Sequence, residues 1–298
     1  MSDSFCWTPQ RKILTPAQTG LSALPVFGIR SSTCADRPLV PHSHPGCLEV
    51  VFFLSGFQIY ETEGHLYSLC GNDVFVVRPG ELHSSGDFPE SVSRMIWFQL
   101  DVTGTEPFLG LDQPSSDELR PALLVLPRLF HANASLGADL AEAFRLLAGH
   151  DPLSAGLGRQ LFVCCLYRLL QFSRSPALPK TDSIGDAIAY IHDHLGEKIS
   201  LEDAAASCNL SLSRFKAKFK EETGSTPRTF INYLKMEQAK LLLNQGNSIT
   251  ETALSLGFET PSYFASTFKK YTGLTPARFC KERAQAGARQ KSAARPVP

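Results

Sequence analysis

His42, His44 and Glu49 lie in the stretch PHSHPGCLEVVFFLSG, residues 41–56. Two histidines on alternate positions, followed by a glutamate five residues later, are side chains that a metal site uses. His83 ends the later stretch RPGELH and would be a fourth ligand. Imidazole and carboxylate together suit Zn, Fe, Ni or Mn, and open coordination positions would allow oxygen chemistry. The same side chains could instead hydrogen-bond the hydroxyl or carboxylate groups of a small ligand.

Short strands must position these four side chains. The first hundred residues contain runs rich in β-branched and aromatic residues that end at Gly or Pro-Gly, a pattern that predicts strands. These runs are residues 49–56, 57–64, 73–80 and 93–100. Their spacing predicts a small antiparallel barrel or sandwich. Alternation along the strands makes Tyr60, Trp97 and Gln99 further candidate linings of an effector pocket.

Helical periodicity follows the strands. Residues 139–150 and 158–174 each carry an apolar face, which predicts a helical segment over residues 136–174. Two uses of this segment stay open, because it could cover the barrel or form the interface of a homodimer. Residues 175–183 contain two prolines and predict a linker.

The charge of the chain is unevenly distributed. The formal net charge is zero, but residues 182–298 hold 16 Lys and Arg against 12 Asp and Glu, a net charge of +4. A basic C-terminal part suits a polyanion-binding module. No run of about eighteen apolar residues predicts a membrane span. The first residues do not resemble a signal peptide, and eight cysteines without a CxxC pair indicate free thiols, so we expect a cytoplasmic protein.

A sequence repeat occupies the last third of the chain. Residues 211–227, SLSRFKAKFKEETGSTP, match residues 260–276, TPSYFASTFKKYTGLTP, at an offset of 49 residues. The shared positions include two phenylalanines, a lysine, Thr-Gly and Thr-Pro. A fixed offset over this many positions indicates a duplicated unit.

Each copy has the sequence signals of a helix-turn-helix unit. Ser200 and Ser248 are expected N-caps of the first helices, each with an acidic residue three positions later. Asn209 and Gly257 are expected to take a left-handed backbone at the corner. Residues 227–246 predict one long helix between the copies, about 25 Å in length. Such a spacer could set two reading helices into neighbouring major-groove segments, which are about 34 Å apart.

The second helix of each copy is expected to have a buried face and an outer face. Phenylalanines four residues apart should point into the core and leave the opposite face for DNA. The outer face presents Ser213, Arg214, Lys216, Ala217 and Lys220 in the first copy, and Ser262, Tyr263, Ala265, Ser266 and Lys269 in the second. Long donors reach guanine edges or phosphates, while Ala and Ser allow close approach to a thymine methyl. The alternative is a merely solvated face; the duplication favours DNA.

Residues 184–283 resemble the DNA-binding domain of the AraC/XylS transcription regulators. The resemblance lies in SLEDAAASCNLSLSRFKAKFKEETGSTP and in ITETALSLGFETPSYFASTFKKYTGLTPARF. It implies seven helices, two helix-turn-helix units and control of transcription, commonly activation, with RNA polymerase as a partner. The second copy is poorer in long donors than the first, so we expect less base discrimination from it. Ala265 and Ser266 stand where such proteins often have a bulkier base-reading residue, a departure that bears on the contacts of the second copy and not on its fold.

The N-terminal part is similar to a cupin barrel, the sensor half of one large branch of that family. His42, His44, Glu49 and Gly56 match the first cupin motif, and RPGELH, ending in His83, matches the core of the second. The resemblance implies a small-molecule pocket in which these residues are polar fixtures or metal ligands.

The sequence therefore predicts a multidomain protein, an all-β cupin barrel with trailing helices followed by an all-α domain with two helix-turn-helix units. The expected parts are an effector-binding domain over 1–135, the helical segment, the linker, a DNA-binding domain over 184–283 and a disordered tail over 284–298. We expect a sequence-specific transcription regulator that is not an enzyme, activates in response to a small polar effector such as a sugar, and requires no cofactor. A cupin metalloenzyme with a DNA-binding appendage is the alternative, and a divalent metal in the barrel stays open.

Overall fold

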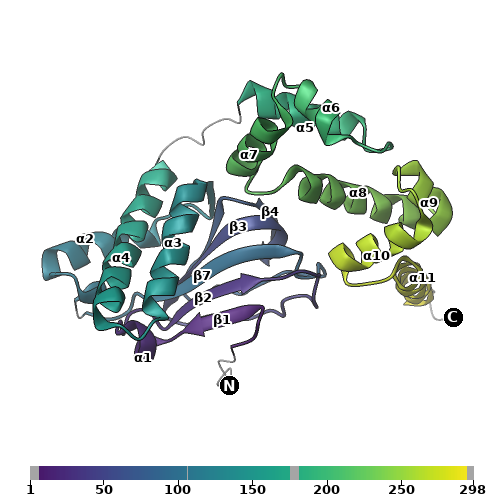
Figure 1. Cartoon of the computed structure of the whole chain (residues 1–298). Helices are drawn as coiled ribbons and strands as arrows, with labels where there is room; N and C mark the ends of the chain where they lie inside the picture. The colour runs from purple at the N-terminus through teal and green to yellow at the C-terminus, as the bar shows by residue number, and fades with distance from the viewer. Residues whose placement is uncertain (1–6, 106, 175–180, 294–298) are drawn as a thin grey trace. The chain divides into compact units, whose positions relative to one another are not determined.

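The structure, a computed structural model, describes residues 7–105, 107–174 and 181–293. The chain forms two compact units, a β-rich N-terminal unit and a helical C-terminal unit (Figure 1). This division confirms the predicted fold class.

The N-terminal unit is built on an antiparallel sheet. Its strands are β1 Arg11–Leu14, β2 Val26–Ser31, β3 Cys47–Thr62, β4 His65–Cys70, β5 Asp73–Val77, β6 His83–Ser84, β7 Ser93–Asp101 and β8 Leu129–His131. The hydrogen-bonded order is β1-β2-β7-β3-β5-β8, and β4 and β6 pair with the second half of β3. Strand β3 therefore belongs to both sides of the barrel.

Strand β3 differs from the sequence prediction of two strands, 49–56 and 57–64, because it runs through Gly56 without a break. A bulge between Phe53 and Ser55 bends it. Gly56 has a φ of 93°, and a Cβ there would lie 2.3 Å from the carbonyl oxygen of Val92. Only glycine fits this bend, which sends the strand from one sheet to the other.

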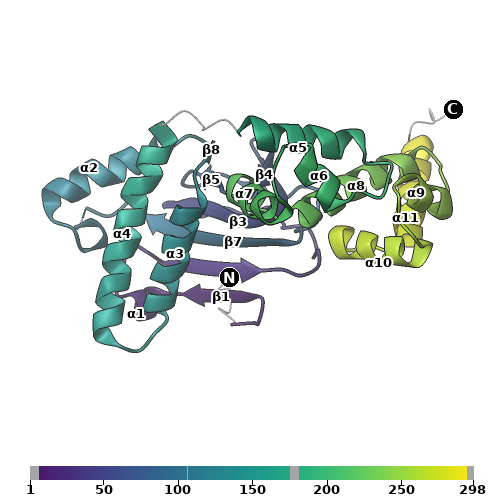
Figure 2. The same ribbon diagram turned by 45° about the horizontal axis from the view of Figure 1, so that its top comes forward.

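Alternate side chains of β3 pack into two different apolar cores. Val50 and Phe52 join the core that also contains Phe144 and Phe162 of two long helices. Val51 and Phe53 point the other way, into a second core inside the barrel. The two helices, α3 Ala134–Leu147 and α4 Pro152–Arg174, lie side by side over one face of the sheet (Figures 1 and 2). The predicted helical segment therefore covers the barrel.

Three short elements lie in the part of the chain predicted to be all-β. They are α1 Pro16–Thr19, the 3-10 turn η1 Phe108–Gly110 and α2 Gln113–Leu124. Leu119 and Leu123 of α2 are buried in the same core as α3 and α4. Most of the predicted linker, residues 175–180, lies outside the described residues, and α5 already begins at Asp182.

The C-terminal unit contains seven helices within the described residues, the number that the resemblance implied. They are α5 Asp182–Asp193, α6 Leu201–Ala206, α7 Leu212–Thr223, α8 Pro227–Asn244, α9 Ile249–Ser255, α10 Pro261–Thr272 and α11 Pro276–Ala293. The pairs α6–α7 and α9–α10 follow the order of the sequence repeat. Helix α8 connects them, and its 18 residues span about 27 Å.

Helix α11 corrects the predicted tail. It continues ten residues beyond the expected domain end at 283, so the prediction of disorder over 284–298 is wrong for residues 284–293. The segment is rich in Ala, Arg, Gln and Lys, which favour helix. Residues 294–298 lie outside the described part of the chain. None of the described helices is long and apolar enough to cross a membrane.

Candidate nucleic-acid interface and histidine cluster

The first helix of each helix-turn-helix unit begins at its predicted cap. The Ser248 hydroxyl accepts a hydrogen bond from the backbone N–H of Glu251, whose carboxylate accepts from the backbone N–H of Ser248. Ser200 accepts from the N–H groups of Glu202 and Asp203. The Ser200 hydroxyl in turn donates to the carboxylate of Glu202 at 3.0 Å, and not to that of Asp203, which was the acidic residue predicted to complete the cap. The caps fix where α6 and α9 start.

The corner of each unit has the expected left-handed residue. Asn209 has a φ of 56° and Gly257 a φ of 66°. At Gly257 glycine is needed for a second reason, because a Cβ there would lie 2.3 Å from the carbonyl carbon of Glu197. These corners set the angle between the two helices of each unit.

The phenylalanine pairs anchor the second helices. Phe215 and Phe219 of α7, and Phe264 and Phe268 of α10, are fully buried, as their spacing predicted. Phe264 packs against Phe258 with ring centroids 5.3 Å apart. Because these side chains fix the rotation of each helix about its axis, the opposite face is held outward.

The outer face of α7 is open to solvent along its length. All five predicted positions, Ser213, Arg214, Lys216, Ala217 and Lys220, are exposed. On α10, Ser262, Tyr263, Ser266 and Lys269 are exposed and Ala265 is half-buried. The Ser266 hydroxyl donates to the carbonyl oxygen of Tyr263 at 2.9 Å. Its proton is therefore engaged, and this hydroxyl is left to accept from a base, whereas α7 offers three long cationic donors.

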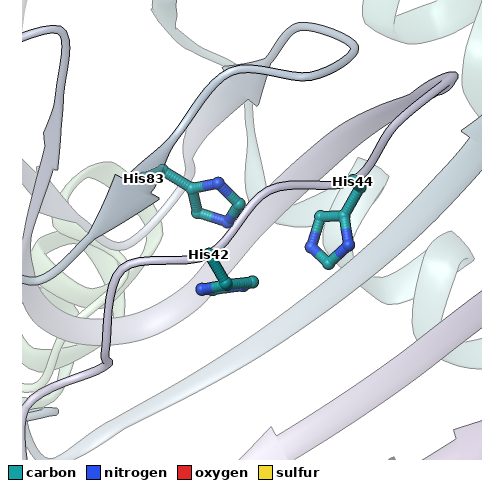
Figure 3. A group of neighbouring side chains, drawn as sticks. All are labelled: His42, His44 and His83. Atoms are coloured by element: carbon teal, nitrogen blue, oxygen red, sulfur yellow. The ribbon is translucent and has the colours of Figure 1, made fainter. Parts of the chain in front are cut away.

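In the N-terminal unit, three histidines form a cluster (Figure 3). One ring nitrogen from each of His42, His44 and His83 lies within 4.8 Å of the others. His42 and His83 are held together by two backbone hydrogen bonds of 3.0 Å, and their ring centroids are 4.2 Å apart. His42 Nδ1 donates to the carbonyl oxygen of Val40 at 2.9 Å, which leaves its Nε2 free to bind a ligand.

Glu49 is buried beside this cluster. Its Oε2 lies 3.1 Å from His44 Nε2, and its Oε1 lies 3.3 Å from His83 Nε2. Gln99, its cross-strand partner, donates to Oε2 at 2.9 Å. Burial by itself would raise the pKa of Glu49, but the contacts with His44 and His83 outweigh it and lower the pKa. Glu49 is therefore an anion facing imidazoles, at the place that the sequence predicted.

The remaining candidate linings point into the barrel. Trp97 of β7 lies opposite Val51 of β3, and Tyr60 is stacked on Phe75 with ring centroids 5.1 Å apart. Both are buried in the apolar core inside the barrel, and burial raises the pKa of Tyr60. Only Gln99 among the three contacts the histidines. The histidine side of the barrel is therefore polar, and the deeper part is filled by aromatic rings.

An ion pair between Arg128 and Glu81, which the sequence did not predict, supports His83. Arg128 donates to both carboxylate oxygens of Glu81, at 2.5 and 2.7 Å. The carbonyl oxygen of Glu81 lies 3.4 Å from His83 Nδ1. Arg128 also donates to the carbonyl oxygen of Val76 on β5, so the ion pair connects the loop before His83 to the sheet. Residues 47 positions apart make this contact, which no local pattern signals.

The cluster fits a divalent metal. His83 Nε2 is buried and faces the other rings; Glu49 Oε1 lies 3.3 Å away, but the pair lacks hydrogen-bond geometry, so this nitrogen makes an ion-pair contact and no well-formed hydrogen bond among the described residues. Burial lowers the pKa of His42 and keeps its ring neutral, the form that binds a metal. Tetrahedral zinc at about 2.0–2.1 Å from each nitrogen needs nitrogens about 3.3 Å apart, so the rings would have to move inward by a small amount. His42, His44 and His83, with Glu49 as the fourth, are the residues that could hold it.

Comparisons with known proteins bear on both units. Residues 204–282 match the family model described as "Helix-turn-helix domain". The chain is 24% identical over 272 residues to the HTH-type transcriptional activator RhaS of Klebsiella pneumoniae (strain 342), covering 87% of this chain and 95% of that one. It is 25% identical over 243 residues to RhaS of Salmonella paratyphi B, covering 79% and 86%. A solved AraC-type transcriptional regulator from Chromobacterium violaceum is 27% identical, covers 35% of this chain and 94% of its own, and aligns with a TM-score of 0.33.

Two capped helix pairs with buried phenylalanines and exposed, donor-rich outer faces define a helix-turn-helix DNA-binding protein. The family model begins within α6 and covers the rest of both pairs, and the RhaS relatives extend the similarity into the N-terminal unit. The chain is therefore a DNA-binding transcriptional regulator, and it is similar to the AraC/XylS regulators, as the sequence resemblance predicted.

Proposed function

We propose that this regulator reads two segments of one DNA duplex, with α7 and α10 as the reading helices, and activates transcription through RNA polymerase. The observation that carries the proposal is the exposure of the predicted faces. Nine of their ten residues are exposed and Ala265 is half-buried, while the phenylalanines on the opposite sides are fully buried. The RhaS relatives are named as activators, which supports the same direction of control here. This role places the protein in the cytoplasm, with the chromosome.

Binding of the full chain to DNA from upstream of its neighbouring genes tests this proposal. Specific binding predicts a target affinity at least about a thousandfold above that for random DNA of the same length. It also predicts a linear fall of log affinity with log salt, because phosphate contacts release counterions. Equal affinity for target and random DNA at every salt concentration would contradict sequence-specific reading.

We further propose that the histidine cluster is the effector site. His42 Nε2, the buried Nε2 of His83 and the Glu49 carboxylate offer donors and acceptors on one side of the barrel. Such a set suits a small polar molecule, for example a sugar, bound directly or through a divalent metal. An effector changes DNA binding only if it binds one arrangement of the protein better than the other.

Metal analysis and a thermal-shift screen separate the alternatives for this site. A sensor predicts that small polar compounds raise the melting temperature of the wild-type chain and not that of the His42→Ala/His44→Ala variant. Stoichiometric metal together with substrate turnover, both lost in that variant, would favour the cupin metalloenzyme alternative. A barrel that no compound stabilises would favour constitutive DNA binding.

The exposed face of α4 supports a homodimer. Leu153, Leu157 and Tyr167 are 85%, 60% and 41% exposed, and with Gln160 and Cys164 between them they follow a spacing of four and three residues. This spacing lines one side of a helix that pairs with another. Sedimentation of Leu157→Glu tests the proposal, because the variant should be monomeric at concentrations where the wild type is dimeric. Leu66→Glu, at an equally exposed leucine of β4, is the matched control.

A further inference from the structure

Lys235 is a buried lysine in the middle of α8, the helix between the two helix-turn-helix units. Its exposed fraction is 5%. Its Nζ donates to the carbonyl oxygen of Glu197 and to that of Leu256, both at 2.6 Å. It also lies 5.5 Å from the centroid of the Phe258 ring. The ammonium group therefore has two carbonyl acceptors and an aromatic face, which together can satisfy its three N–H bonds.

The two carbonyl groups belong to different helix-turn-helix units. Glu197 lies in the segment just before Ser200, which caps α6 of the first unit. Leu256 is the C-cap residue of α9 in the second unit and directly precedes the corner residue Gly257. Lys235 thus joins the start of the first unit to the corner of the second, across 21 residues to Leu256 and 38 residues to Glu197.

The two segments also touch each other directly. The close approach of Gly257 to the Glu197 backbone leaves no room for a Cβ. Lys198 forms an ion pair with Glu259 at 2.5 Å, but the two side chains are 76% and 72% exposed. An exposed pair of this kind contributes little, whereas a buried charge with every partner in place tolerates little displacement. Lys235 is therefore the buried polar contact that joins the two segments, beside the close packing of Gly257 on the Glu197 backbone.

Without this contact the second unit would be less constrained. Helix α8 ends at Asn244, and Gly246 follows with a φ of 95° and open space where a Cβ would lie. Such a connection can change its backbone angles at low cost. An apolar core of α8, α9 and α10 holds the second unit on α8. Lys235 adds the contact that also reaches the first unit, so it links the orientation of α10 to that of the first unit.

We propose that Lys235 is a positioning residue for DNA binding, which locks the two helix-turn-helix units at one separation and thereby selects the spacing between the two DNA segments that they read. The inference rests on the proposed function that both α7 and α10 contact DNA. Lys235 itself is buried and reads no base.

Spacing selectivity is the readout, because a lysine needed only for stability would not alter it. A binding site is first selected from a random duplex pool with the wild-type full chain. Affinity is then measured for that site and for versions with one or two base pairs inserted or removed between the two recognised segments. The wild type should lose at least about tenfold in affinity at each altered spacing. Lys235→Met should bind the original site about tenfold more weakly than the wild type does. Its affinity for the altered spacings should be less than about threefold below its own affinity for the original site.

Three further variants make the test decisive. Lys235→Arg retains charged donors and should recover most of the selectivity. Lys240→Met makes the same substitution on the same helix at a side chain paired with Glu237, and should behave as the wild type. Should Lys235→Met not fold, Lys235→Gln, which keeps two N–H donors without the charge, replaces it in the series. Its selectivity should also be reduced.

Two outcomes contradict different parts of the argument. If the wild type is selective and the folded Lys235 variants remain equally selective, the positioning role is wrong while the reading by two helices stands. If the wild type itself tolerates every spacing, the proposal that both helices read one duplex fails.

Discussion

Lys216 and Lys220 lie one turn apart on the exposed face of α7, yet we expect them to act differently. Lys216 lies nearer the N-terminal half of the reading helix, which contacts base edges in such units, so Lys216→Ala should reduce discrimination between target and random DNA by about 1–3 kcal/mol. Lys220→Ala should weaken binding to both DNAs alike and lower the slope of log affinity against log salt by about one. Titrations of both variants at several salt concentrations measure these effects.

A matched control for these titrations is Lys240→Ala, a lysine of α8 outside the two reading faces and paired with Glu237. It should retain both the discrimination and the salt slope. If all three variants lose affinity equally, the assignment of separate base-reading and phosphate-binding roles on α7 is wrong.

His83 provides a metal test that does not depend on activity. Because its Nε2 is buried and lacks a hydrogen-bond partner among the described residues, a metal at the cluster would bind that nitrogen. Zinc at about a hundred times its dissociation constant should stabilise the wild type by about 2.7 kcal/mol and should not stabilise His83→Phe. Differential scanning calorimetry with and without zinc and chelator measures the shift.

His131 supplies the comparison for that test. Its Nδ1 lies 2.8 Å from Asp73 Oδ1, outside the cluster. His131→Phe should keep the zinc-dependent shift. If zinc leaves the wild type unchanged, the three histidines are hydrogen-bonding fixtures of an effector pocket and not metal ligands.

At the scale of elements, Gly257 at the corner of the second unit makes the clearest prediction. Alanine there would adopt a strained left-handed backbone and would clash with the Glu197 backbone. We expect Gly257→Ala to lower the free energy of unfolding by about 2–4 kcal/mol. At Gly246, where φ is also positive but the space is open, alanine should cost only about 1–2 kcal/mol. Urea unfolding followed by circular dichroism compares the two; equal losses would mean that the close packing at Gly257 contributes nothing.

Elements were predictable where their signals are local. The caps Ser200 and Ser248, the corners at Asn209 and Gly257, and the buried phenylalanines depend on residues within a few positions, and the structure confirms them. Helices α3 and α4 were found from periodicity, although α3 begins five residues earlier because Asn133 caps it.

Features that depend on distant pairing were missed or misread. The sequence predicted a break at Gly56, whereas pairing with β7 on both sides of the bulge keeps β3 continuous. Strand β1 is short and half exposed, so it lacks a clear apolar pattern. The Arg128–Glu81 ion pair and the Lys235 contacts join residues 21 to 47 positions apart. His42, His44 and Glu49 were predicted together because their motif is compact, and His83 was predicted from a second motif, but the contacts of His44 and Glu49 with Gln99 needed the sheet register.

At the scale of the whole molecule, Lys235 predicts how stability depends on pH. Burial lowers its pKa from 10.5 to about 8. Below pH 8 the lysine is protonated in both the folded and the unfolded chain, so it adds no pH dependence. Between about pH 8 and 10.5 the unfolded chain binds more protons, so the free energy of unfolding should rise with pH. Chemical unfolding from pH 7 to 10 measures the slope, and Lys235→Met should remove this part of it. If Lys235→Met shows the same slope as the wild type, the pH dependence of the free energy of unfolding comes from another group.

Strand β3 also has a consequence for how the N-terminal unit opens. Because its two halves are hydrogen-bonded into different sheets through one unbroken backbone, neither sheet can separate without displacing the other. Amide hydrogens at both ends of the strand should therefore exchange with solvent deuterium at one common, slow rate set by complete unfolding. A molecule that binds the histidines would therefore approach from the side on which His42 and His44 are half-exposed, without any separation of the two sheets.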